Sequence, residues 1–390
     1  MTVGAHRGRL VGRHQERQLL ADALRTAESG EPRALIVTGD AGIGKTRLVE
    51  EVIRQLEGRW LVASGHCVEA GPAGLPYAPL SGILGAVAAT AQGARLLDDA
   101  ASAAPGLLPL VGGEVVHPPV DTTSGLSQLR LFDALVRLLG ELSGHRPTMV
   151  VIEDLHWADS STRAFLSFLC RNLMPRPLVV LVTARTDELH RKHPLRLLLG
   201  ELARLPAVTS IELGGLDTGE LGELLAGHHG APVPRNVVDS IARRSGGNPF
   251  FAEQLWVVGA GQADTRPTIE LADVLLHRVD RLSDEAQHLL RAASLAGQRI
   301  EHGLLLAVAG QQESAVTAAL RECADVRLFE PEADGGAYRF RHALLAEVIA
   351  ADAIPTERRS LHARFADALA GNAPAAVVAR HCLGAADLPG

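Results

Sequence analysis

Two patterns of apolar and polar positions alternate along the first half of the chain. Five short strand-like runs rich in apolar residues occur, and the first of them is a continuous apolar run of the kind seen in parallel strands buried on both faces of a sheet. These runs occupy residues 34–38, 60–64, 148–152, 178–183 and 208–213. Between them, apolar side chains recur at helical spacing, most clearly in residues 15–29, 48–56 and 126–142. Strands that alternate with helices predict an α/β fold, in which a parallel sheet carries helices on both faces.

The pattern changes after residue 213, where strand-like runs give way to helical segments. Residues 259–267 contain two glycines and a proline and are the best candidate for a linker. Four helical segments then precede a predicted two-stranded wing, formed by residues 328–330 and 338–341. The wing would turn through Asp334-Gly335-Gly336.

These changes predict the domain organisation. We expect a disordered start at residues 1–9, an α/β core at 10–213, a small helical domain at 214–262, a wing-containing domain at 263–355 and a helical segment at 356–390. Residues 70–120, which are rich in glycine and proline, are predicted to be an insertion in the core.

Composition narrows the classes of partner. The chain has 390 residues, a formal net charge of −7 and a pI of about 6.1, which gives no general attraction to nucleic acid or to an anionic membrane. No run reaches the ~18–20 apolar residues that a membrane helix needs. Four widely spaced cysteines form no CxxC pair, as is typical of reduced thiols in a cytosolic protein. We therefore expect a cytoplasmic protein with no membrane partner.

The strongest chemical signal is a glycine-rich loop between the first apolar run and the helical segment that follows it. It reads Gly39-Asp40-Ala41-Gly42-Ile43-Gly44-Lys45-Thr46 and is followed by Arg47. Glycines let backbone N–H groups turn inward around phosphates, and the start of the following helix adds a positive dipole end. Lys45 would reach the β- and γ-phosphates and the Thr46 hydroxyl would bind Mg²⁺. The loop predicts a P-loop that binds ATP or ADP with Mg²⁺.

A pair of acids, Glu153 and Asp154, follows the third apolar run. Nucleotide hydrolysis needs an acid at a neighbouring strand end, where it holds the metal and orients water. Two adjacent carboxylates are costly at a strand end unless a metal or solvent lies beside them. Many P-loop ATPases place Asp before Glu, and this chain has the reverse order. The order leaves open which of the two acids holds Mg²⁺ and which polarises the water.

The residues around this pair carry a more specific resemblance. Glu153-Asp154-Leu155-His156-Trp157-Ala158-Asp159 resembles the extended Walker B motif of the STAND class of AAA-like signal-transduction ATPases. More narrowly, it resembles the ATPase region of large ATP-binding LuxR-type transcriptional regulators. The resemblance implies an AAA-like P-loop core, followed by a helical lid domain and a winged-helix regulatory domain. It also implies a switch that is closed with ADP and competent to assemble or signal with ATP.

Four further segments support the resemblance and imply nucleotide contacts. Residues 10–16 resemble the box that holds adenine, and residues 182–185 resemble a strand-end sensor of the γ-phosphate. Residues 245–250 resemble a lid motif whose proline packs on the base, and residues 338–344 resemble a segment that ends in a nucleotide-sensing histidine. The residues implied are Val11, Gly12, Arg13, Arg185, Pro249 and His342. From the residues alone, two alternatives remain: Arg185 could be a surface arginine, and His342 could be a packed histidine.

The output of such a switch is a separate question. Residues 266–352 carry nine Arg and fourteen Asp or Glu, so their charge is 9 − 14 = −5, whereas a DNA-reading module usually has a basic surface. We therefore expect no direct DNA binding by this segment. In the family it resembles, a helical repeat array follows the ATPase region, and a C-terminal domain after that array reads DNA. The segment Arg380-His381-Cys382-Leu383 resembles the first helix of such an array. The inducer is not readable from the sequence. A same-class module that serves a cyclase or kinase, and a catalytic ATPase acting on a small substrate, remain alternatives.

Overall fold

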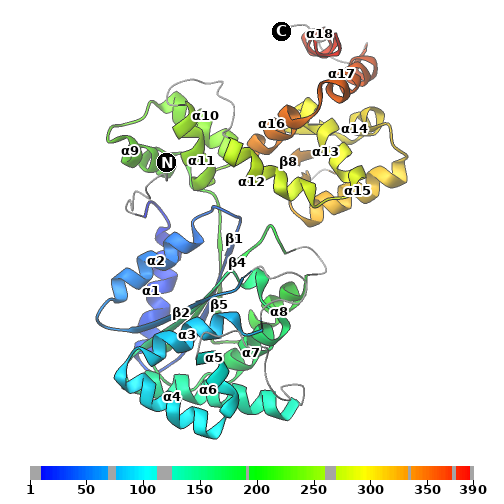
Figure 1. Cartoon of the computed structure of the whole chain (residues 1–390). Helices are drawn as coiled ribbons and strands as arrows, with labels where there is room; N and C mark the ends of the chain where they lie inside the picture. The colour runs from blue at the N-terminus through cyan, green and yellow to red at the C-terminus, as the bar shows by residue number, and fades with distance from the viewer. Residues whose placement is uncertain are drawn as a thin grey trace. The chain divides into compact units, whose positions relative to one another are not determined.

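The computed structural model describes residues 10–68, 76–111, 125–189, 193–259, 269–332, 335–370 and 375–386. The chain divides into two compact units (Figure 1). The first unit is Gly12–Leu213, and the second unit is Gly214–Gly390 together with Met1–Val11. The predictions for residues 1–9, for the linker after Gly259 and for Asp334 of the predicted turn lie outside the described residues.

A parallel five-stranded sheet forms the centre of the first unit. Its strands are β1 (Arg33–Gly39), β2 (Leu61–His66), β3 (Thr148–Glu153), β4 (Leu178–Arg185) and β5 (Val208–Leu213), in the spatial order β2-β3-β4-β1-β5. Each coincides with one of the five apolar runs to within one or two residues at each end. The prediction of a parallel-sheet α/β fold is therefore confirmed.

Helices cover both faces of this sheet (Figure 1). Helices α1 (His14–Glu28) and α2 (Lys45–Leu56) pack against β1, and α1 also packs against β4. The other helices of the unit are α3 (Ala78–Ala88), α4 (Ala91–Ala103), η1 (Pro105–Leu107), α5 (Leu108–Val111), α6 (Gly125–His145), η2 (Leu155–Trp157), α7 (Ser160–Arg171) and α8 (Pro194–Leu202). Side chains alternate between the faces along a strand, so Ile36 joins the cluster that contains Leu135 and Phe165, while Leu35 is buried beneath the opposite face.

The predicted insertion is helical where it is described. Helices α3 and α4 belong to the apolar core of the first unit, and α3 packs against the edge strand β2. Asp159 joins this region to the end of β3: its carboxylate caps α7 by accepting the N–H groups of Ser161 and Thr162, and it also accepts the N–H of Tyr77 at 3.2 Å. Asp159, the last residue of the motif around the acid pair, therefore has a structural role.

The second unit begins with three helices, α9 (Thr218–His229), α10 (Arg235–Ser245) and α11 (Pro249–Gly259). Asp217 starts α9 through a complete capping box with Glu220, which satisfies two backbone donors that would otherwise be unpaired. The unit continues with α12 (Ile269–Asp280), α13 (Asp284–Ala296), α14 (His302–Ala309), α15 (Glu313–Asp325), α16 (Ala343–Asp352), α17 (Pro355–Leu369) and α18 (Ala375–Ala385). One continuous apolar cluster runs from Leu216 to Phe365, and the subdivision of this unit into smaller domains stays a prediction.

The small sheet of the second unit differs from the predicted two-stranded wing. It has three antiparallel strands, β6 (Arg299–Glu301), β7 (Phe329–Pro331) and β8 (Ala337–Phe340), in the order β6-β8-β7. The sequence does not reveal β6 because this three-residue edge strand buries only Ile300 between two exposed residues. A single buried residue produces no periodic pattern.

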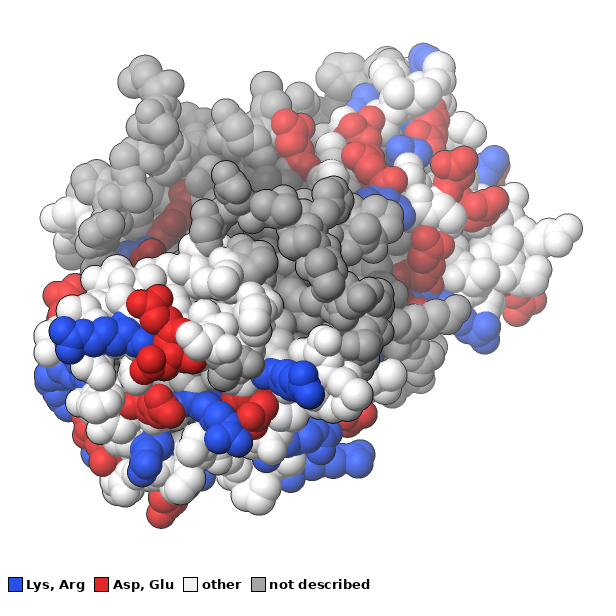
Figure 2. All heavy atoms as spheres, turned by 60° about the horizontal axis from the view of Figure 1, so that its bottom comes forward, with Lys and Arg blue, Asp and Glu red and all other residues white. Residues whose placement is uncertain are grey.

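Among the residues that the structure describes, no helix is both long enough and apolar enough to cross a bilayer. On the face that comes forward in Figure 2, acidic and basic side chains are interspersed. A mixed surface of this kind produces no extended field of one sign.

Candidate nucleotide-binding site

The predicted phosphate-binding loop and the predicted acids meet at one edge of the sheet. In the parallel register, Gly39 at the end of β1 lies beside Arg185 of β4 and Leu213 of β5, and Glu153 of β3 lies beside His66 of β2. All five strands therefore end at the same edge, where open α/β sheets bind their ligands.

The loop has the open backbone that phosphate binding requires. Gly42 and Gly44 have φ angles of 73° and 101°, which glycine adopts without steric cost. Lys45 is buried at the first turn of α2, and its Nζ donates to the carbonyl oxygens of Gly39 at 2.9 Å and Asp40 at 2.8 Å. Burial lowers the pKa of Lys45 below its usual value, and the nearby carboxylate of Asp187 opposes this shift. The ammonium group is thus held inside the loop by groups that a phosphate could replace.

Glu153 points from β3 toward the loop. The Thr46 hydroxyl donates to Glu153 Oε2 at 3.2 Å, and His66 Nδ1 lies 3.7 Å from Oε1 of the same carboxylate. Burial raises the pKa of Glu153, which favours the protonated acid unless a cation lies beside it. A hydroxyl and a carboxylate at this separation are oxygen donors suited to Mg²⁺. Their arrangement fits a magnesium ion held from the loop and the strand end.

Asp154 points elsewhere because its backbone is left-handed, with φ 56°. Its N–H donates to Thr183 Oγ1 of β4 at 3.1 Å. Its carboxylate is partly exposed and lies 3.9 Å from His156 Nε2. The two adjacent acids therefore have different neighbours: Glu153 faces the loop and Asp154 faces the end of β4.

Arg185 lies at the end of β4, as the sequence predicts for a strand-end sensor. Its Nη1 donates to Glu188 Oε1 at 2.9 Å, and its guanidinium lies 5.2 Å from the centroid of the Trp157 ring, a cation–π distance. The guanidinium is about one third exposed. It is thus restrained by two groups at an edge where it can still reach a ligand.

Thr186 and Asp187, the two residues that follow Arg185, connect the end of β4 to the phosphate-binding loop. Thr186 Oγ1 donates to Asp40 Oδ1 at 2.8 Å, and the N–H of Ala41 donates to Asp187 Oδ1 at 3.2 Å. The end of β4 therefore contacts the phosphate-binding loop directly.

Arg13, which directly precedes α1, also contacts the phosphate-binding loop. Gly12 and Arg13 both have left-handed backbones, with φ angles of 65° and 59°. The buried guanidinium of Arg13 donates to the carbonyl oxygen of Ile43 at 3.0 Å and pairs with Glu16 at 3.3 Å. Arg13 is therefore a structural contact of the loop as well as a candidate nucleotide contact.

Comparison with known proteins agrees with this geometry. Residues 9–182 match the model of the AAA ATPase domain. The chain contains an AAA-like ATPase region. It is a P-loop NTPase fold, which implies nucleotide binding, usually with Mg²⁺.

Individual relatives extend beyond this region. The Walker-type ATPase of Pyrococcus abyssi is 16% identical, with a TM-score of 0.55 over 87% of this chain and 96% of that one, and this likeness shows a shared fold. A STAND protein with a tetratricopeptide-repeat sensor from Pyrococcus horikoshii is 16% identical over 98% of this chain and 48% of that one, at a TM-score of 0.40. An uncharacterised protein of Rhizobium meliloti is 26% identical over 94% of this chain. The chain spans 37% of the length of that relative.

Sequence reasoning missed several residues of the AAA-like ATPase region. These residues are the three that follow β4. The N–H of Thr186 donates to the carbonyl oxygen of Gly39 at 3.1 Å, Asp187 accepts from the N–H of Ala41, and Glu188 pairs with Arg185. Their place after a strand that ends at the ligand edge was the only signal that could have identified them. Arg47, which was predicted to contact nucleotide, is half-buried on α2.

The remaining predicted nucleotide contacts belong to the second unit. Val11 is half-buried and packs against the apolar cluster of that unit. It therefore belongs to the second unit, whereas the predicted core, residues 10–213, groups it with Gly12 and Arg13. Pro249 is the first residue of α11 and is half-buried. Pro at this position is well suited to start a helix.

His342 lies against the glycine-rich segment that precedes α11. A Cβ atom on Gly246 would lie 2.9 Å from His342 Nδ1, and the ring of Phe251 meets the His342 ring edge-on at 5.2 Å. The imidazole is buried, with 7% of its surface exposed. The structure thus brings together two segments, around residues 246 and 342, that the resemblance assigns to nucleotide sensing.

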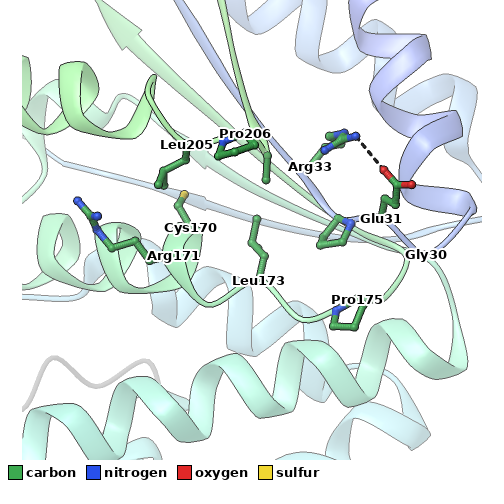
Figure 3. Close-up of a pocket in the computed structure, with 11 residues that line it drawn as sticks. Gly30, Glu31, Arg33, Cys170, Arg171, Leu173, Pro175, Leu205 and Pro206 are labelled. Carbon is green, nitrogen blue, oxygen red and sulfur yellow. Dashed lines mark hydrogen bonds and ion pairs between the residues drawn. The ribbon is translucent and has the colours of Figure 1, made fainter.

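A separate cavity of about 640 Å³ lies where β1 and β5 begin, at the opposite edge of the sheet (Figure 3). Its wall includes Arg33, which pairs with Glu31 at 3.0 Å, and the buried thiol of Cys170. None of the predicted nucleotide contacts lines this cavity. The predicted nucleotide contacts therefore lie at the carboxyl edge of the sheet, whereas this cavity lies at the amino edge.

Proposed function

We propose that the chain is an ATP/ADP-dependent signalling switch of the STAND type, acting in the cytoplasm as the ATPase module of a LuxR-type transcriptional regulator. The observation that carries the proposal is the convergence of Lys45, Thr46 and Glu153 with Asp154 and Arg185 at one sheet edge. Each of these residue types has a defined task in phosphoryl chemistry.

The two acids divide the work in this proposal. Thr46 and Glu153 hold Mg²⁺, since their oxygen atoms already lie together beside the loop. Asp154 orients the attacking water, because its partly exposed carboxylate faces the end of β4. When bound, the magnesium ion neutralises the charge on the phosphate oxygens. Arg185 contacts the γ-phosphate.

The other nucleotide contacts in this proposal are those that the resemblance implies. Gly12, Arg13 and Val11 form the adenine box, Pro249 packs on the base, and His342 contacts the β-phosphate of ADP. The packing of His342 on Gly246 and Phe251 supports this last role, because it holds the imidazole on a rigid segment. ATP in place of ADP would shift the equilibrium between closed and open forms only by the difference in its contacts with the two.

The hydrolysis rate follows from the role of a switch. A protein that signals in its ATP state must remain in that state, so turnover should lie well below the ~10 s⁻¹ typical of metabolic enzymes. Titration calorimetry with ATP and ADP, combined with light scattering in each nucleotide, tests the proposal. ATP-dependent assembly with slow phosphate release supports it. Equal assembly in both nucleotides, or no binding of either, contradicts it.

The transcriptional output rests on the resemblance of residues 153–159 to the LuxR-type regulators. The negative charge of residues 266–352 argues against DNA reading by this segment, so DNA would be read by another part of the protein. Determining the full-length product of the gene would decide this point. A helix-turn-helix domain supports the proposal, and a cyclase or kinase domain would replace it with the same switch serving another output.

A further inference from the structure

His156 lies in the short helix η2. In the sequence it stands between Asp154, the candidate catalytic acid, and Trp157, whose ring stacks on Arg185. Its side chain is buried, with 5% of the residue exposed, and its ring lies 4.6 Å from the Trp157 ring. A buried imidazole beside two carboxylates and a guanidinium needs a specific hydrogen-bonding arrangement.

One ring nitrogen of His156 identifies the tautomer. The backbone N–H of Arg185 points at His156 Nδ1, at an N···N distance of 3.4 Å. A backbone N–H can only donate, so Nδ1 must be the acceptor, and the proton of the neutral ring must be on Nε2. Burial lowers the pKa of His156 to about 3, which agrees with a neutral ring.

The other nitrogen, Nε2, points toward acids. Among the residues that the structure describes, none forms a hydrogen bond with this buried atom. Asp154 Oδ1 lies 3.9 Å away and Glu188 Oε2 lies 3.8 Å away, each just beyond hydrogen-bond distance. Glu188 already pairs with Arg185 through its other oxygen. A small rotation of the Asp154 carboxylate would satisfy Nε2–H, and a buried N–H without a partner is costly enough to favour that rotation.

We propose that His156 is a positioning residue for ATP hydrolysis, whose Nε2–H orients the Asp154 carboxylate while its Nδ1 fixes the backbone of Arg185. The inference rests on the proposed function, because it assigns Asp154 to the attacking water. His156 itself does not touch the nucleotide. It connects the acid at the end of β3 with the sensor at the end of β4.

Two substitutions separate the two contacts of the ring. His156→Asn keeps an acceptor near the position of Nδ1 and removes the donor at Nε2. His156→Gln keeps a donor near the position of Nε2 and removes the acceptor. If Nε2–H orients Asp154, His156→Asn lowers kcat roughly 10-fold or more, as expected for one hydrogen bond to a charged group, and leaves KM unchanged. His156→Gln retains most of kcat.

A double-mutant cycle shows whether His156 acts through Asp154. In a chain that already carries Asp154→Asn, the proposal requires His156→Asn to lower single-turnover hydrolysis no further, because the group it orients has been removed. Additive losses in the cycle would overturn it. So would wild-type kcat in His156→Asn, or a loss in His156→Gln with none in His156→Asn, which would reduce His156 to a support for the Arg185 backbone.

A measurement on the unsubstituted chain covers the case in which His156→Asn does not fold. Nuclear magnetic resonance of ¹⁵N-histidine-labelled chain, assigned with His156→Gln, reports which ring nitrogen carries the proton. A proton on Nε2 that shifts when ADP with aluminium fluoride and Mg²⁺ is added supports the proposal. A proton on Nδ1, or no shift in the presence of the bound analogue, overturns it.

The outcomes also separate this inference from the proposed function. If the chain binds neither ATP nor ADP, the proposed function fails. If it binds both but shows no Mg²⁺-dependent hydrolysis, or hydrolysis that is insensitive to His156→Asn, the switch can stand and only the role of His156 fails.

Discussion

Thr46 and Glu153 are 107 positions apart in the sequence, yet the Thr46 hydroxyl donates to Glu153 Oε2 at 3.2 Å. The contact joins the start of α2, which follows β1, to the end of β3, and only β4 lies between β1 and β3 in the sheet. It distinguishes the two adjacent acids, because the Asp154 carboxylate instead lies 3.9 Å from His156 Nε2.

Lys45→Ala should weaken ATP binding about 10-fold or more, since it removes the buried charge that would pair with the phosphates, and each ~1.4 kcal/mol is tenfold. Calorimetry measures the affinity. Arg54→Ala, an exposed cation near the end of the same helix, is the matched control and should bind ATP as the wild type does. Equal affinity in the Lys45 variant would refute the assignment of the loop.

The two acids should give different kinetic signatures. Asp154→Asn should leave Mg-ATP affinity within about twofold and reduce phosphate release, because it changes the group that orients water. Glu153→Gln should instead raise the Mg²⁺ concentration needed for half-maximal hydrolysis, because it removes a charged oxygen next to Thr46. A magnesium titration of both variants distinguishes these outcomes. Identical magnesium curves would show that the division of roles is wrong.

Arg185→Ala should weaken ATP binding more than ADP binding, by roughly 10-fold in the ratio, if the guanidinium contacts the γ-phosphate. Arg185→Lys retains a charge but loses the planar stacking on Trp157, so it should fall between the alanine variant and the wild type. Competition binding with both nucleotides provides the ratio. An unchanged ratio in the alanine variant would make Arg185 a surface residue that merely pairs with Glu188.

His342→Ala should loosen ADP binding more than ATP binding and favour the assembled form. The expected cause is loss of a contact made by an imidazole that Gly246 and Phe251 hold in place. Nucleotide affinities and light scattering measure both effects. His302→Ala, another histidine of the second unit that packs beside Tyr338, provides a comparison in which neither should change.

The docking of α18 should weaken in acid. His381 stacks on Phe365 at 4.5 Å, and burial together with the nearby charge of Arg380 lowers its pKa from 6.5 to about 4. Since the folded-state pKa is depressed, His381 stabilises docking fully above about pH 6.5, and this contribution is lost as the pH falls toward 4.

Amide exchange in α18, corrected for intrinsic rates, should therefore be faster at pH 5 than at pH 7. The control is His381→Phe, which keeps an aromatic ring next to Phe365 but cannot titrate at this position, so its protection should depend less on pH than that of the wild type. Equal protection of the wild type at both pH values would show that His381 does not control the docking of this helix.

The sequence by itself determined the elements of the first unit and the chemistry of the loop. Continuous apolar runs occur where strands are buried on both faces, so β1, β3 and β4 were evident without the structure. The edge strands β2 and β5 are only partly buried, and they were recognised as strand-like runs between helical segments. The loop from Gly39 to Thr46 was equally evident, because its glycines and its lysine have local tasks. The edge strand β6 was not, because one buried residue, Ile300, produces no pattern.

Tertiary structure alone decided which residues meet. The order β2-β3-β4-β1-β5 places Glu153 beside Thr46 and brings Asp187 to the N–H of Ala41. In the second unit, the fold brings His342 to Gly246. The sequence pattern around a residue predicts whether its side chain is buried, because burial follows the period of the helix or strand that contains it. The pattern does not predict which residue that side chain contacts, because contacts depend on strand order and register, which are set by the packing of the whole sheet.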